Sequence, residues 1–147
     1  MKKILTAACS ILAISIVLVS CDTIKNLPTN TTGGLFSLNG TWRLNATTDN
    51  KALQGSTITV YPVVGNGTIK TLENNTYCVK EGEQIWKSVK SNNAGGFTFS
   101  TLVSACNGSI VYRDANLTVI NNDEVTVTTR TASGTELIQQ WQRVTSK

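Results

Sequence analysis

The side chains that could do chemistry are few in this 147-residue chain, and one common catalyst is missing altogether. The sequence contains no histidine, which excludes the Ser/His and Cys/His pairs in which an imidazole activates a nucleophile. Its nine carboxylates fall mainly in expected turns or at strand ends, and not in pairs suited to acid/base catalysis. The sequence has neither a calcium-loop spacing nor a phosphate-binding loop. We therefore expect no catalytic residues, no metal and no cofactor, and predict that the protein is not an enzyme.

Cysteine is the residue type with distinctive chemistry that remains, and its placement near the N-terminus is informative. Two lysines at 2–3 precede an apolar run over 4–19, which is shorter than the roughly 20 residues that span a bilayer. A charged start, a short apolar core and a small residue at the break are typical of a secretory signal. The run ends Leu18-Val19-Ser20-Cys21, and this stretch resembles the lipobox of bacterial lipoproteins.

The lipoprotein resemblance implies a lipid anchor on Cys21. In that family a diacylglycerol is attached to the thiol, a peptidase cuts between Ser20 and Cys21, and the new amino group is acylated, with palmitate as one such chain. A thiolate is the soft nucleophile that this step needs, and two or more acyl chains anchor a protein stably. The alternative is a plain signal peptide or a short anchor helix with Cys21 incidental.

These observations predict three segments and an address. We expect a signal peptide over 1–20, a lipidated cysteine with a flexible tether over 21–37, and one folded domain over 38–147. The predicted location is the cell envelope, on the outer rather than the inner membrane.

The two later cysteines suit that exported location. Exported proteins meet an oxidising compartment, so we predict a disulfide between Cys78 and Cys106. The formal net charge of +4 lies partly in the leader, and no Lys/Arg cluster is visible. We therefore expect no nucleic-acid partner.

From residue 38 onward, short stretches of β-type residues alternate with turn signals such as GNG, ENN and SNNAGG. We expect strands over 40–46, 56–64, 68–72, 76–80, 84–90, 97–103, 110–120, 124–130 and 135–144. In the second, Ile58, Val60 and Val64 should share a face, and in the last a bulge is expected near Gln139 and Gln140. Short connections favour antiparallel neighbours, and such a sheet closes to hide its edges. We predict an all-β fold, a small antiparallel up-and-down barrel of about eight strands.

Two motifs at opposite ends of this domain share a family pattern. Gly40-Thr41-Trp42 opens the first expected strand, and Arg143 lies in the last. This pairing resembles the lipocalin and lipocalin-like barrels. The resemblance implies that Trp42 plugs the barrel floor and that Arg143 packs across its indole, a favourable cation–π contact.

Two functions remain open on this sequence. The first is a monomeric, membrane-anchored module that binds a small apolar or amphipathic ligand in a pocket of Trp86, Phe97 and Phe99, with Arg113 facing an anionic head group. The alternative is a structural or protein-interaction lipoprotein of the envelope, an inhibitor or assembly factor, whose core is filled by its own side chains.

Overall fold

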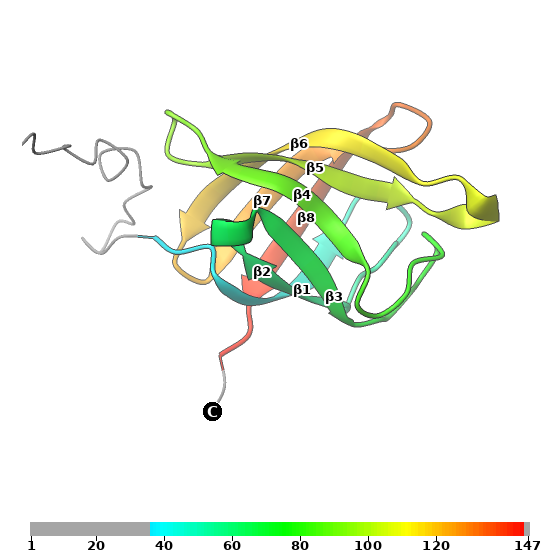
Figure 1. The fold of residues 1–147 in the computed structure, drawn as a ribbon, viewed down its shortest axis with the longest axis horizontal. Helices are drawn as coiled ribbons and strands as arrows, with labels where there is room; N and C mark the ends of the chain where they lie inside the picture. The colour runs from blue at the N-terminus through cyan, green and yellow to red at the C-terminus, as the bar shows by residue number, and fades with distance from the viewer. Residues whose placement is uncertain (1–35, 146–147) are drawn as a thin grey trace, which may run out of the picture.

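Eight antiparallel strands follow one another around a closed sheet in the computed structural model, which describes residues 36–145 (Figure 1). They are β1 (Gly40–Thr47), β2 (Thr57–Tyr61), β3 (Asn66–Thr71), β4 (Gln84–Ser91), β5 (Phe97–Ser104), β6 (Val111–Asn121), β7 (Glu124–Arg130) and β8 (Glu136–Arg143). Strand β1 closes the barrel, because Trp42 lies opposite Ile58 of β2 and opposite Arg143 of β8. Every strand thus has a neighbour on each side, and the predicted all-β, up-and-down barrel is confirmed.

The strands follow the period-2 pattern of a sheet with one buried face. In β7, Val125, Val127 and Thr129 are buried, while the residues between them are partly exposed. In β8, Leu137 and Trp141 are buried in the same way. One face of each strand therefore fills the barrel and the other faces solvent.

The connections divide the barrel into two ends, which Figure 1 shows at opposite sides of the view. What we call the loop end carries the three longest connections, at 48–56, 72–83 and 105–110, together with the turn at 131–135. What we call the floor end carries the connections at 62–65, 92–96 and 122–123, together with the entering segment 36–39 and the exit of β8.

The strand expected over 76–80 is wrong, because this segment belongs to the loop between β3 and β4. Its alternating pattern has another cause. The side chains of Tyr77 and Val79 are buried beneath the loop, whereas Cys78 has a positive φ of 59°. A single backbone bond, from Ala105 N–H to the Tyr77 carbonyl at 2.8 Å, ties the segment to the next loop. The alternation at 76–80 therefore reflects side chains buried beneath a loop, and not a strand of the sheet.

Two finer expectations about strand faces are also wrong. Val64 does not share a face with Ile58, because Pro62 begins a single 3-10 turn, η2 (Pro62–Val64), that leaves Val64 67% exposed. Proline has no N–H to donate to a ladder, so the strand ends before it.

The second concerns the bulge expected near Gln139 and Gln140. Residues of β8 alternate without interruption opposite β7. The extra residue lies in the partner strand β1, between Leu44 and Ala46.

Candidate functional site

The barrel interior is the first place to look for a ligand, and aromatic side chains fill it. The Trp86 ring lies 4.6 Å from that of Phe99 and 5.3 Å from that of Trp141, between ring centroids. Nearer the floor end, Phe36 lies 6.1 Å from Phe97. All five side chains are buried members of one apolar cluster. These distances are those of packed aromatic pairs, so the rings contact one another where a ligand would lie.

Both ends of this interior are covered. Trp42 is fully buried at the floor end, where Phe36 packs on it at 6.2 Å between centroids. At the loop end, Leu53 and Tyr77 are buried and belong to the same apolar cluster. The barrel is therefore a packed core rather than an open cup.

Three of the four residues predicted to line a ligand pocket come together, and the fourth does not. Trp86, Phe97 and Phe99 lie in the core, but Arg113 is exposed on the outer wall. Its guanidinium donates to the Ala132 carbonyl at 3.0 Å, in the turn between β7 and β8. Although Arg113 shares the parity of buried residues further along β6, its long side chain reaches outward over that turn and keeps the charge in solvent.

The floor end is organised around Arg143. Its guanidinium carbon lies 4.3 Å from the centroid of the Trp42 ring, and the Trp42 indole N–H donates to the Leu38 carbonyl at 2.9 Å. Partial burial lowers the pKa of the Arg143 guanidinium from its ordinary value, and the Asp123 carboxylate at 3.5 Å opposes that shift. The group stays charged and covers the indole, as the lipocalin resemblance implied for these positions.

The same guanidinium joins three carbonyls of two segments. It donates to the carbonyls of Ser37 at 2.6 Å, Asn39 at 2.8 Å and Asn122 at 2.9 Å. Gly40 leaves space for it, because a side chain there would bring Cβ to 3.1 Å from the guanidinium. Arg143 thus fixes the entering chain and the β6–β7 turn onto the last strand.

The loop end is held by a covalent bond as well as by hydrogen bonds. Cys78 and Cys106 form a disulfide with a Cα–Cα distance of 5.0 Å, so the predicted pairing is confirmed. It joins the β3–β4 loop to η3 (Cys106–Gly108), the turn that follows β5. The Tyr77 hydroxyl donates to Asp49 at 2.7 Å and adds the β1–β2 loop to this group. Burial and the neighbouring Asp49 carboxylate raise the pKa of Tyr77 well above its ordinary value of 10.0.

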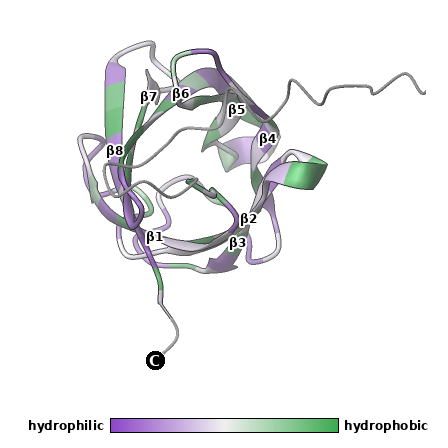
Figure 2. Cartoon of the chain, turned by 90° about the vertical axis from the view of Figure 1, so that its left-hand side faces the viewer, coloured by the Kyte–Doolittle hydropathy of each residue, from purple (hydrophilic) through white to green (hydrophobic). Residues whose placement is uncertain are grey.

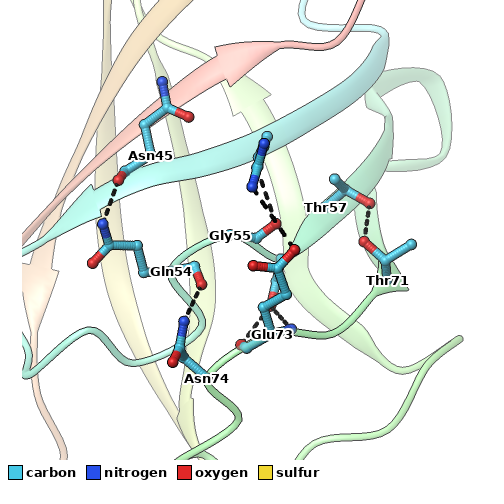
Figure 3. A network of polar contacts seen from close by, with 9 residues as sticks. Asn45, Gln54, Gly55, Thr57, Thr71, Glu73 and Asn74 are labelled. Carbon is cyan, nitrogen blue, oxygen red and sulfur yellow. Dashed lines mark hydrogen bonds and ion pairs between the residues drawn. The ribbon is translucent and has the colours of Figure 1, made fainter.

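A polar groove of about 450 Å³ lies at this end, and Figure 3 shows the polar contacts among the residues that surround it. Its polar groups mainly bond one another. Gln54 donates to the Asn45 carbonyl at 2.8 Å, and Asn74 donates to the Gln54 carbonyl at 2.7 Å. Arg43 lies 3.8 Å from Glu73 across the groove. The contacts among the groove residues therefore join the β1–β2 loop to the β3–β4 loop.

Beneath the groove, Ser56 makes the best-buried contact between these two loops. Its hydroxyl donates to the Glu73 carbonyl at 2.9 Å and accepts from the Glu73 N–H at 2.8 Å. Ser56 is fully buried, and its hydroxyl takes the place of a backbone partner for both the N–H and the carbonyl of Glu73.

Over residues 36–145 no cluster of three or more His, Cys, Asp or Glu side chains is arranged to hold a metal ion. The same part of the chain contains no helix that is both long and apolar enough to cross a membrane. Cys21 and the lipobox lie outside the described residues, so the predicted lipid anchor stays a prediction.

Comparison of the chain with protein-family models, with curated proteins and with solved structures found no match.

Three residues with structural roles were not predicted from the sequence. Phe36 lies in the predicted tether but belongs to the core, and its alternation with Leu38 was the available signal. Ser56 and Tyr77 gave no such signal, because their roles depend on loops that meet only in the folded chain.

Proposed function

We propose that this chain is a lipid-anchored, non-enzymatic protein of the cell envelope whose barrel is a rigid scaffold for contact with another protein. The N-terminal leader with its Leu-Val-Ser-Cys ending supports the anchor on Cys21. The absence of histidine and the lack of paired carboxylates in the sequence support a non-enzymatic role.

The observation that carries the proposal is the filled interior. Trp42, Trp86 and Trp141 are each at most 1% exposed, and their neighbours occupy the remaining space. A ligand cavity for a small lipophilic molecule usually measures about 300 to 1,000 Å³, and making one here would require the central aromatic rings to move apart. The cost of separating such well-packed rings argues against ligand carriage and favours the interaction function.

The loop end is the surface best suited to a protein partner. Four connections gather there, and binding residues lie disproportionately on loops held by a rigid scaffold. The disulfide and the bonds of Ser56 and Tyr77 fix these loops before any partner arrives. Such preorganisation lowers the entropic cost of association. Ile110, which is 60% exposed, adds an apolar contact at this end.

The anchor is tested by two cysteine variants of the full chain expressed in a bacterium that makes lipoproteins. Cys9→Ser is the matched control, since Cys9 lies within the leader and lacks the lipobox context. Wild type and Cys9→Ser are expected to take up labelled palmitate and to partition into detergent, whereas Cys21→Ser should do neither. Palmitate uptake by Cys21→Ser would contradict the proposed anchor.

The scaffold role is tested by titrating the mature protein with an apolar fluorescent probe such as N-phenyl-1-naphthylamine. We expect no saturable rise in probe emission, because the interior offers no space. Saturable binding of one probe per chain, displaced by a fatty acid, would overturn the scaffold function and restore ligand binding.

A further inference from the structure

The floor end carries an apolar surface that neither the core nor the loop end accounts for. Five of the seven exposed large apolar side chains among residues 36–145 lie at this end; they are Tyr61, Val63, Val64, Ile120 and Val144. The strongest cluster is η2, where Val63 is fully exposed and Val64 is 67% exposed. Figure 2, which views this end, shows the η2 turn standing out from the barrel wall.

This turn is held in its protruding position. The Gly65 N–H donates to the Pro62 carbonyl at 3.0 Å and closes the turn, with Gly65 at a φ of 68°. The Gly65 carbonyl in turn accepts from the Val89 N–H at 3.0 Å, which fixes η2 to strand β4. Two valines on a fixed turn are therefore presented to solvent, although exposing apolar surface is unfavourable.

The entering chain meets this patch. Ser37 and Asn39 line the same hollow, of about 430 Å³, as Tyr61 and the η2 valines. Figure 1 shows the segment that follows residue 36 passing beside η2. Cys21 lies 15 positions before Phe36 in the sequence, so the chain between them spans at most about 50 Å. That limit keeps an anchored barrel close to the bilayer, joined to its anchor at the floor end, where residue 36 enters.

We propose that the floor end rests on the membrane and that η2 inserts Val63 and Val64 into the lipid interface. This inference relies on the lipid anchor of the proposed function and adds an orientation to it. Tyr61, 51% exposed, has the amphipathic ring that favours the head-group level. An apolar face at an anchored surface gains binding free energy from burial in the interface.

Charged side chains near the patch are few and of both signs, with Lys90 and Arg143 against Asp123 and Glu124, so apolar burial is the main attraction to the bilayer. Lys90 follows Val89 directly on β4 and is exposed beside η2; a lysine near an anionic surface is attracted to it. The Asp123 carboxylate at this end is paired with Arg143, which reduces its repulsion of anionic lipid. In this orientation the loop end points away from the membrane, where a protein partner can reach it.

The test uses the mature chain with Cys21→Ser and a hexahistidine tag before residue 21, tethered to vesicles of phosphatidylcholine, phosphatidylglycerol and a nickel-chelating lipid. An environment-sensitive NBD probe is attached at Val63→Cys or, as the control, at Ser133→Cys in the exposed β7–β8 turn of the loop end. The probe at 63 is expected to shift its emission to the blue and to be quenched by spin-labelled lipid, whereas the probe at 133 should do neither.

A second pair of variants separates insertion from mere proximity. With the probe at 63, Val64→Asp should abolish most of the shift, and Ile110→Asp, an equally exposed aliphatic position at the other end, should leave it unchanged. An unshifted probe at 63, or equal shifts at 63 and 133, would overturn the proposal. A shift that appears without vesicles and grows with protein concentration would overturn it in favour of self-association. In this experiment the nickel-chelating lipid replaces the anchor on Cys21. A failure of Cys21 acylation would therefore contradict the proposed function, but it would not affect the probe measurement at position 63.

Discussion

The two ends of the barrel are closed by different means. At the floor end one side chain, Arg143, stacks on Trp42 and bonds three carbonyls. At the loop end several contacts hold the loops together, namely a disulfide, the hydrogen bonds of the buried Ser56 hydroxyl and the Tyr77–Asp49 hydrogen bond. The connections differ accordingly, with short turns at the floor and longer loops at the other end.

This difference suggests a division of roles. A floor closed by one cation across an indole needs little chain, so short turns suffice at that end. Loops that are fixed at several separate points can present a broad surface without collapsing into the barrel. The central aromatic rings separate the two ends, so we expect changes at one end to leave the other intact.

The largest effect is expected from removing the disulfide of the loop end. Cys78→Ala with Cys106→Ala should lower the free energy of unfolding by about 3.5 kcal/mol, because a 29-residue loop is no longer closed in the unfolded chain. Urea unfolding followed by tryptophan fluorescence measures it. Reductant should destabilise the wild type and leave the double variant unchanged; insensitivity of the wild type would contradict the account.

At the floor end, Arg143→Met should cost about 2 kcal/mol, because three charge-assisted hydrogen bonds and the contact of the guanidinium with the Trp42 ring are lost. Arg113→Met is the matched control, since its exposed guanidinium makes one bond, to Ala132, and should cost less than about 0.5 kcal/mol. Equal costs in urea unfolding would show that Arg143 does not close the barrel.

Within the loop-end groove, Ser56→Ala should cost about 1 to 2 kcal/mol, because the buried Ser56 hydroxyl loses its two hydrogen bonds, to the N–H and to the carbonyl of Glu73. Glu73→Ala removes only the half-exposed ion pair with Arg43 and should cost less than about 0.5 kcal/mol. The reverse order would show that the groove is held by its charges.

The smallest effect on stability is expected from substituting Tyr77, which should also change how stability depends on pH. Its pKa is raised in the folded chain, so the unfolded chain loses the phenol proton first as the pH rises above about 10. Stability from this group is complete below that pH and falls above it. Tyr77→Phe should cost about 1 kcal/mol at pH 7 and flatten the alkaline decline measured by thermal unfolding. An unchanged alkaline slope would contradict the buried phenol.

The fold could be predicted from local patterns in the sequence, and one end of the barrel from a family resemblance. Alternation in the strands and the Asn/Gly turns are readable along the chain, and they predicted the closed sheet; the contact of Trp42 with Arg143 was implied by the lipocalin resemblance. Tyr77 misled the same reasoning, because burial under a loop and burial in a sheet produce the same alternation.

The rest depends on contacts between loops that are distant in sequence. The buried hydroxyl of Ser56 meets Glu73 seventeen positions away, and no local pattern marks such a meeting. Whether the interior is filled was likewise undecided, since Trp86 and Phe99 suit a pocket lining as well as a core until their separation is known.

The filled interior is the central claim, and native mass spectrometry tests it most directly. The mature chain is expressed in an oxidising compartment, purified without detergent, and weighed under native and denaturing conditions. We expect the native and the denatured mass to be equal, because the disulfide is present under both conditions. A reproducible extra mass that leaves on denaturation would show a bound small molecule inside the barrel and would contradict it.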